Sequence, residues 1–324
     1  MKRRQFITLL GGAAVASPLP LGAQQTTRRA RLGILIFSTP ERDPNTQSFL
    51  RGLRELGYAE GQNIDIEYRF AEGKAERLPE LAAELVQRKP DVVFALGGDV
   101  APLVSKATQN IPIVYAMSAD PVQLGLAASL SRPGGNATGV TFLSDELAAK
   151  RLEILKEAAP RISRVAFLSN PEHADNELPI ARRAAAAHSV QLQPMEVRDA
   201  GDFDRAFEFA LRAGVDAVYV VSSRQTVANI PHIVDFAAKN RLPLAGGWGA
   251  WAQAGGLVSY GPNVGEMVRQ TALYVDKILK GAKPSELPIQ QPTKFELLVN
   301  LKTAKSLGLT IPEAFLFRAD KVIE

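Results

Sequence analysis

The sequence contains no cysteine and only three histidines, His173, His188 and His232, among its 324 residues. Without cysteine the chain can form no disulfide, thiolate nucleophile, cysteine-ligated zinc site or lipid-modified N-terminal cysteine. The histidines have no H-x-x-x-H spacing, the charged residues at 172–175 are typical of a solvated loop, and no G-x-S-x-G motif is present. We therefore expect no metal site, no cofactor and no catalytic residue.

Long apolar runs are also absent. The most apolar stretch near the N-terminus, residues 7–16, is half the length of the ~20 residues that a membrane-spanning helix needs. It follows Lys2, Arg3 and Arg4 and precedes small residues that end at Ala23. This order predicts a secretory signal cleaved near Ala23 and a periplasmic protein. The Arg-Arg-x-Phe pattern favours twin-arginine export, although a general secretory signal has a similar outline.

The net charge gives little evidence for a polyanionic partner. The formal charge of +4 falls to +1 without residues 1–23, because that segment holds Lys2, Arg3 and Arg4 and no acidic residue. A nucleic-acid-binding domain normally carries a clustered positive excess. We therefore expect no nucleic-acid partner.

Short β-rich runs alternate with longer amphipathic runs along the first part of the chain. Strand, helix, strand in this order is typical of a parallel sheet with helices on both faces. The predicted strands are residues 31–37, 63–69, 91–96 and 111–116, and the predicted helices are residues 45–56, 75–88 and 100–109.

The same alternation begins again after residues 133–136 (PGGN). Two similar α/β units in succession predict two similar, Rossmann-like lobes, and a chain of this length exceeds one ordinary core. The predicted strands of the second unit are residues 137–142, 164–168, 191–197, 217–221, 242–245 and 257–260. Its predicted helices are residues 145–158, 180–188, 203–213 and 227–240, followed by a helix at 266–279, an extended stretch at 287–300 and a helix at 301–307.

Small polar residues follow many of the predicted strands. Ligands of open parallel sheets bind beyond the carboxyl ends of the strands, where helix N-termini favour anionic groups. The alternative is that these residues cap helices and form turns. The candidate ligand contacts of the first unit are Ser38, Gly98, Asp99, Ser118 and Asp120, and those of the second are Ser144, Asn170, Ser222, Ser223, Arg224 and Thr226.

The two tryptophans, Trp248 and Trp251, lie in a glycine-rich stretch between two predicted strands, which we interpret as a loop. Trp248 is a candidate for stacking on a flat or apolar ligand, and packing onto the domain is the alternative. Arg224 could pair with a ligand carboxylate or form a surface ion pair. The sequence has no G-x-x-x-x-G-K-[ST] motif and, after residue 23, no G-x-G-x-x-G motif, which argues against a nucleotide ligand.

Three segments, residues 53–86, 111–141 and 292–312, resemble bacterial ABC-transporter substrate-binding proteins of the group that includes tryptophan-binding lipoproteins. The resemblance implies the type I periplasmic-binding fold, with crossing segments near 141–144, 260–262 and 290–293 that form a hinge. Lobe 1 would comprise residues 31–141 plus 261–290, and lobe 2 residues 142–260 plus 291–324. The absence of the lipid-modified cysteine of Gram-positive relatives favours a freely diffusing protein.

The expected function is that of a monomeric solute receptor. It would close by hinge bending on a small molecule, with an amino-acid-like or aromatic carboxylate favoured, and deliver it to an ABC permease in the inner membrane. A sensor of the same fold that feeds a signalling receptor is the alternative. An exported α/β enzyme is a third possibility, which would need a catalytic cluster that the sequence does not offer.

Overall fold

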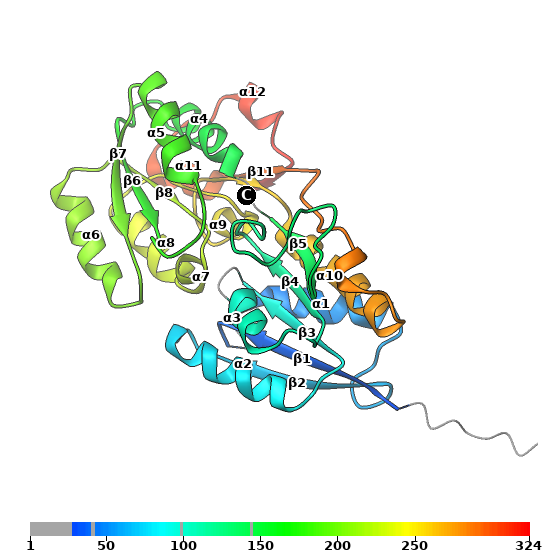
Figure 1. The fold of residues 1–324 in the computed structure, drawn as a ribbon. Coiled ribbons are helices and arrows are strands. Elements are labelled where there is room, and N and C mark those ends of the chain that lie inside the picture. The colour runs from blue at the N-terminus through cyan, green and yellow to red at the C-terminus, as the bar shows by residue number, and fades with distance from the viewer. Residues whose placement is uncertain (1–27, 40–42, 98–99, 143–144) are drawn as a thin grey trace, which may run out of the picture.

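Two β-sheets, each with helices on both faces, make up the described part of the chain (Figure 1). The computed structural model describes residues 28–39, 43–97, 100–142 and 145–324, so the predicted signal lies outside the described residues. No helix in these ranges is long and apolar enough to cross a membrane.

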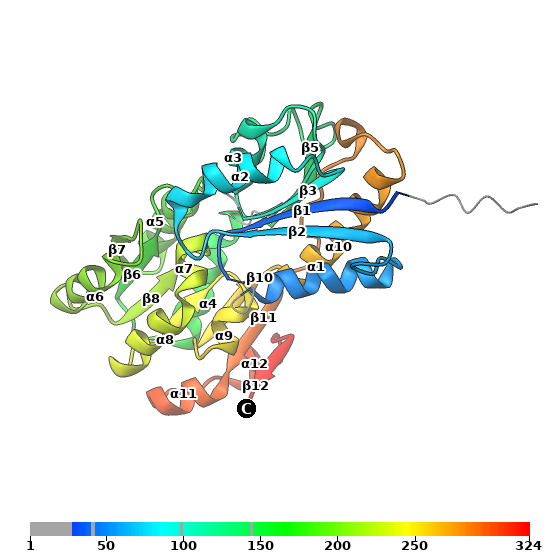
Figure 2. The same ribbon diagram turned by 90° about the horizontal axis from the view of Figure 1, so that it is seen from below.

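The first sheet has five parallel strands in the order β2-β1-β3-β4-β5. Its central strands are short apolar runs buried on both faces, as a parallel sheet between two helical layers requires. Helices α1 and α10 cover one face, and α2 and α3 cover the other (Figure 2). The bounds are β1 (Ala30–Ile36), α1 (Pro44–Glu55), β2 (Ile64–Phe70), η1 (Ala75–Arg77), α2 (Leu78–Gln87), β3 (Val92–Leu96), α3 (Val100–Ala107), β4 (Ile113–Met117), β5 (Ala137–Thr141), α10 (Val264–Leu279) and η3 (Pro284–Glu286).

The second sheet has seven strands in the order β12-β11-β10-β9-β8-β6-β7, all parallel except the β10–β11 pair. Helices α4, α5, α11 and α12 pack on one face, and α6, α8 and α9 pack on the other. The bounds are η2 (Asp145–Leu147), α4 (Ala148–Ala158), β6 (Arg164–Ser169), α5 (Glu177–Ala187), β7 (Gln191–Glu196), α6 (Asp202–Arg212), β8 (Ala217–Val220), α7 (Arg224–Ala228), α8 (Ile230–Lys239), β9 (Leu244–Gly246), α9 (Gly249–Gln253), β10 (Val258–Gly261), β11 (Glu296–Asn300), α11 (Leu301–Leu307), α12 (Glu313–Leu316) and β12 (Lys321–Ile323).

The chain passes between the two sheets after β5, after β10 and before β11. The first and third passages lie side by side, because the backbone N–H of Thr141 donates to the carbonyl of Gln290 at 2.9 Å. The predicted fold class, two α/β lobes joined by three segments, is confirmed. The exact lobe limits stay a prediction; below, lobe 1 denotes the first sheet with its helices and lobe 2 the second.

The predicted single helix at 227–240 is instead two helices, α7 and α8. The first begins three residues earlier, because Ser223 and Thr226 form a reciprocal capping box at its N-terminus. It ends at Ala228 with Asn229 as its C-cap, and Pro231 stands in the first turn of α8. Proline has no backbone N–H to continue the helical hydrogen bonds, so the helix is interrupted there.

The predicted loop around the two tryptophans contains a short helix, α9. Trp248 occupies its N-cap position, and Trp251 is completely buried in the core of lobe 2. A Cβ atom on Gly246 would lie 2.3 Å from the Trp251 ring, so this glycine is needed for packing rather than for a loop. Of the predicted extended stretch at 287–300, only β11 is a strand, and α12 and β12 have no counterpart in the prediction.

Candidate functional site

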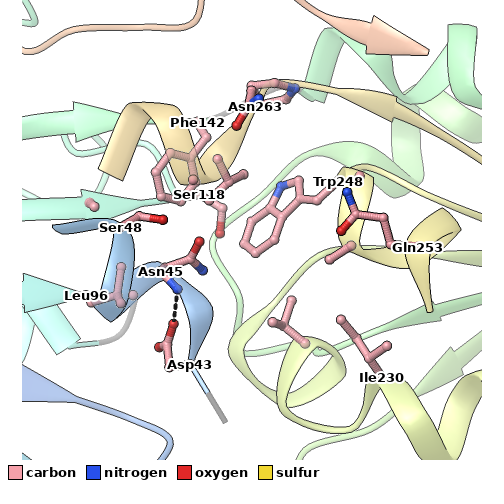
Figure 3. Close-up of a pocket in the computed structure, with 18 of the residues that line it drawn as sticks. Asp43, Asn45, Ser48, Leu96, Ser118, Phe142, Ile230, Trp248, Gln253 and Asn263 are labelled. Atoms are coloured by element: carbon pink, nitrogen blue, oxygen red, sulfur yellow. Dashed lines mark hydrogen bonds between the residues drawn. The ribbon is translucent and has the colours of Figure 1, made fainter. Parts of the chain in front are cut away.

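A cavity of about 720 Å³ lies between the two lobes (Figure 3). Its lining comes from the carboxyl ends of β1, β3 and β4, from the first turns of α1 and α10, and from α7 and α9 of lobe 2. This is the position at which open parallel sheets bind ligands, and the volume lies in the range of about 300–1,000 Å³ that is usual for small-molecule sites.

Lobe 1 presents short polar side chains to the cavity. Ser38 and Ser118 follow β1 and β4, and Asp43, Asn45 and Ser48 come from the start of α1. The Asp43 carboxylate caps this helix by accepting the Asn45 N–H at 2.9 Å (Figure 3). Burial raises the pKa of Asp43 above its ordinary value, against the backbone hydrogen bonds from Asn45 and Thr46 that lower it. The lobe 1 wall therefore carries one partly buried carboxyl group beside neutral donors and acceptors and the Arg51 side chain.

Lobe 2 presents larger side chains. Trp248 points from the start of α9 toward the lobe 1 wall, and Ile230 lies on the same side of the cavity (Figure 3). Arg224, the first residue of α7, lines the same cavity with a side chain that is only 9% exposed. Its guanidinium lies 3.6 Å from the exposed Glu172 carboxylate. This part of the wall therefore offers an indole face and a positive charge, and Glu296, Asp320 and Lys321 line the cavity from β11 and the start of β12.

Three contacts join the lobes across the cavity. The Ser118 hydroxyl and the His173 Nε2 atom are 3.1 Å apart. The Arg224 guanidinium lies over the Phe37 ring at 5.0 Å, and Trp248 meets Phe142 edge to face at 5.6 Å. Because the Ser118–His173 and Arg224–Phe37 contacts need both lobes together, the structure represents a closed arrangement.

Five of the residues predicted from the sequence lie at the cavity: Ser38, Ser118, Ser223, Arg224 and Trp248. The elements that carry them are far apart in the sequence. They come together because the strand ends of both sheets face the cavity between the lobes. Three further candidates, Gly98, Asp99 and Ser144, lie outside the described residues.

The structure does not place the remaining four candidates on the cavity, and local hydrogen bonds explain why. The Asp120 carboxylate accepts the N–H groups of Val122 and Gln123, and the Asn170 carbonyl oxygen accepts that of Glu172. Ser222 accepts the indole N–H of Trp251 at 3.0 Å. Thr226 is completely buried in the α7 capping box. For Asp120, Asn170 and Thr226 the alternative interpretation, a cap or turn role, describes their contacts, whereas Ser222 is held by the buried Trp251 indole.

Sequence reasoning missed the contribution of α1 and of the hinge. Asp43, Asn45 and Ser48 line the cavity, as do Gln253 of α9 and Asn263, the N-cap of α10. The sequence did contain a signal for Asp43, Asn45 and Ser48. Asp-Pro-Asn is a typical helix start, and it follows the first predicted strand. No local pattern marks Gln253 as a lining residue.

The described lining residues of the cavity include no recognisable catalytic or metal centre. Within the described ranges, no group of three or more His, Asp or Glu side chains could hold a metal ion. Ser118 and His173 come from different lobes, so their contact depends on closure. A two-lobed receptor that encloses a small molecule is the class of protein that this fold and cavity define.

Comparisons with known proteins agree with that class. The family model for ABC transporter substrate binding proteins matches residues 33–323, and the chain belongs to this family. Its members are binding proteins rather than enzymes, and the predicted family and the predicted absence of enzymatic activity are confirmed.

The chain is similar to a curated tyrosine-binding protein of Clostridioides difficile (strain R20291), with 24% identity over 273 residues that cover 83% of this chain and 78% of the relative. A conserved domain protein from Vibrio cholerae superposes with a TM-score of 0.84 at 29% identity, over 91% of this chain and 100% of that one. An ABC domain from Streptococcus pneumoniae in complex with L-Trp has a TM-score of 0.83 at 25% identity, with the same coverage of both chains.

Proposed function

We propose that this protein binds an aromatic amino acid, or a related aromatic carboxylate, between its lobes and delivers it to the permease of an ABC importer. The observation that carries the proposal is a cavity between the lobes with a tryptophan, arginines and carboxyl groups on its walls. Relatives described as tyrosine-binding and as an L-Trp complex favour the same ligand class. The N-terminal signal pattern supports export to the periplasm, where such a receptor meets an inner-membrane permease.

A zwitterionic ligand would connect the two walls. Arg224 of lobe 2 is suited to the carboxylate, because guanidinium–carboxylate hydrogen bonds are strong and directional. Asp43 of lobe 1 is suited to the ammonium group. Since the two charged groups belong to different lobes, one ligand satisfies both only when the lobes are together, which favours the closed state.

The ring of the ligand would lie against Trp248. The indole projects into the cavity and is itself held by the edge-to-face contact with Phe142. Aromatic pairs of this kind contribute about 0.5–1.5 kcal/mol beyond the area that they bury. Val227 and Ile230 extend the apolar surface beside it. This side of the cavity therefore favours a flat apolar group over a sugar.

Thermal denaturation with a ligand panel tests the proposal. The panel contains L-tryptophan, L-tyrosine, L-phenylalanine, indole-3-acetate, L-alanine and glucose. A ligand at about 100 times its Kd stabilises the native state by about 2.7 kcal/mol, so we expect a clear rise in Tm with at least one aromatic compound and none with glucose. A panel in which no aromatic compound raises Tm would overturn the proposed ligand class.

A pair of variants then locates the binding surface. Trp248→Ala should weaken the affinity for the bound aromatic compound by about 10- to 100-fold, since stacking and apolar burial are both lost. Phe209→Ala is the matched control, because Phe209 is an aromatic residue on the outer surface of α6 that is 47% exposed. Calorimetric titration should give the wild-type Kd for this control. Equal losses in the two variants would show that Trp248 is not a ligand contact.

A further inference from the structure

We propose that a buried charged cluster in lobe 2, formed by Arg151, Glu177 and Tyr219, positions the lobe 2 wall of the cavity and thereby sets ligand affinity. None of the three residues lines the cavity. They act as positioning residues because they bond or pack against backbone that carries the hinge and Trp248. The inference depends on the proposed function only for the choice of ligand used in its test.

The cluster is tightly connected. The Arg151 Nη1 atom donates to the Glu177 Oε2 atom at 2.8 Å, and the Tyr219 hydroxyl donates to the same oxygen at 2.8 Å. Side-chain exposure is 2% for Arg151 and 8% for Glu177, and Tyr219 is completely buried. Burial works against the charged guanidinium, but the adjacent Glu177 and Tyr219 raise the pKa of Arg151 above its ordinary value. Arg151 therefore stays charged and keeps its donors fixed.

Arg151 also holds the second interlobe passage. Its Nε atom donates to the carbonyl of Tyr260 at 2.8 Å. Tyr260 lies near the end of β10, from which the chain passes back to lobe 1. A guanidinium has donors in a rigid plane, so binding Glu177 and Tyr260 together fixes their relative position. The hinge strand is thus tied to the interior of lobe 2.

The same guanidinium supports the segment that carries Trp248. A Cβ atom on Gly247 would lie 2.9 Å from the Arg151 Cζ atom, so the guanidinium packs directly against the backbone one residue before Trp248. A Cβ atom on Gly261 would lie 1.8 Å from the Gly247 carbonyl oxygen. The hinge strand and the Trp248 segment therefore touch each other where Arg151 touches both. A shift of the guanidinium would move the indole relative to lobe 1.

Glu177 connects the cluster to the Ser118–His173 contact between the lobes. It is the first residue of α5, and the loop before it carries His173, which meets Ser118 of lobe 1. Two further carboxylates fix the end of that loop: Asp175 accepts the N–H of Glu177 at 2.9 Å, and Asp145 accepts that of Asn176 at 2.8 Å. The hinge, the Trp248 segment and the His173 loop therefore share one buried anchor.

A role in stability alone would not require a buried charged cluster. Well-packed apolar residues of similar volume often stabilise an interior as well as a buried ion pair does, because desolvation of the charges is costly. The feature that apolar residues could not reproduce is the directional bond from Arg151 to the Tyr260 carbonyl. That bond acts on the backbone that has to bend when the lobes open and close.

Removing a single hydroxyl group tests the inference. Tyr219→Phe keeps the ring, its burial and its stacking on Phe167, and deletes only the hydroxyl, with its bond to Glu177 and the longer bond that it accepts from Arg151 at 3.4 Å. Tyr115→Phe is the matched control, because Tyr115 is also completely buried in a parallel strand and its hydroxyl has no hydrogen-bond partner among the described residues. Arg151→Lys is a second test variant, which keeps the charge but loses the planar fork.

Two measurements separate this inference from the ligand proposal. Kd is measured by calorimetry with the aromatic compound that raises Tm most in the panel; Tyr219→Phe should weaken it about three- to tenfold, as expected for loss of one buried hydrogen bond, and Tyr115→Phe should not. Hydrogen exchange of the ligand-free protein is measured at residues 171–176, 246–249 and 258–263, where Tyr219→Phe and Arg151→Lys should accelerate exchange.

The outcomes are distinguishable. If no compound binds the wild type, the ligand class is wrong, and the exchange experiment alone decides the inference. Unchanged exchange in those three segments for both Tyr219→Phe and Arg151→Lys would overturn the positioning role. Faster exchange with an unchanged Kd would overturn the link to affinity.

Discussion

The two lobes hold their sides of the cavity in different ways. In lobe 1 the wall is the start of α1, and this helix lies closely against α10. A Cβ atom on Gly52 would lie 2.3 Å from the carbonyl oxygen of Arg269, and the ion pair of Arg269 with Glu55 lies at the surface. In lobe 2 the wall rests on the buried Arg151–Glu177–Tyr219 cluster.

The difference predicts which kind of substitution would disrupt each wall of the cavity. Close helix packing tolerates no added volume but is insensitive to charge, because the groups in contact are backbone and apolar side chains. A buried ion pair is sensitive to the loss of either partner, since the remaining charge stays in an apolar interior. Lobe 1 should therefore respond to changes in size and lobe 2 to changes in charge.

The largest effect should come from removing the buried charge of lobe 2. Arg151→Met leaves Glu177 without its cation and should lower the free energy of unfolding by about 3–5 kcal/mol. Arg269→Met is the lobe 1 counterpart, and it should cost no more than about 1 kcal/mol because its ion pairs are exposed. Urea denaturation followed by circular dichroism gives both values. Similar losses in the two variants would contradict the comparison.

The second largest effect is expected at Gly52 of lobe 1, where the sign of the change in stability tests how closely α1 packs against α10. In an exposed helix, Gly→Ala stabilises by about 0.5–1 kcal/mol. At Gly52 the added methyl group meets backbone of α10, so Gly52→Ala should instead destabilise by about 1–3 kcal/mol and weaken ligand binding by displacing the start of α1.

Gln47→Ala is the control for this variant, because Gln47 is exposed on the same helix and its replacement should change stability by less than about 0.5 kcal/mol. Thermal denaturation of the two variants and the wild type decides the point. A rise in Tm for Gly52→Ala would show that α1 and α10 are free to adjust.

The sequence predicted well what depends on neighbours along the chain. The alternation of strands and helices is visible because each element buries a periodic apolar face. Polar residues were expected at the strand ends for the same reason, and Ser38 and Ser118 lie in the lining of the cavity. The break at Asn229 could also have been read from Pro231, since that signal is local.

Contacts between distant segments could not be predicted. Nothing near Ser222 indicates that its hydroxyl accepts the indole N–H of Trp251, which lies 29 residues further on. Nothing near Arg151 indicates that it packs under Gly247 and bonds Tyr260. Trp248 and Trp251 share one short segment, yet one faces the cavity and the other the core. Their roles follow from the orientation of α9, which only the folded lobe defines.

The smallest predicted effect is a pH dependence that comes from two carboxyl groups of lobe 2, Asp175 and Asp145. Burial, together with the nearby Glu177 and Asp145 carboxylates, raises the pKa of Asp175 to about 7, against the Glu177 N–H bond and Arg151, which lower it. Burial likewise raises the pKa of Asp145 to about 6, with Glu177 and Glu146 acting in the same direction and the Asn176 N–H and Arg151 against it. In the unfolded chain both groups ionise near about pH 4, so between about pH 4 and 7 the folded state binds more protons. Stability should therefore fall as the pH rises through this window.

Asp175→Asn keeps an acceptor for the Glu177 N–H but cannot ionise, so it should raise Tm by about 2–4 °C at about pH 8 and by less at about pH 5. Glu266→Gln is the lobe 1 control. A hydrogen bond from Arg269 lowers the pKa of Glu266, so its contribution is present above about pH 4 and is lost only in more acid solution. The effect of this control on Tm should therefore be the same at both pH values. If Asp175→Asn also changed Tm equally at the two pH values, the carboxylates beside the hinge would titrate as they do in water, and lobe 2 would not be the charge-sensitive half of the molecule.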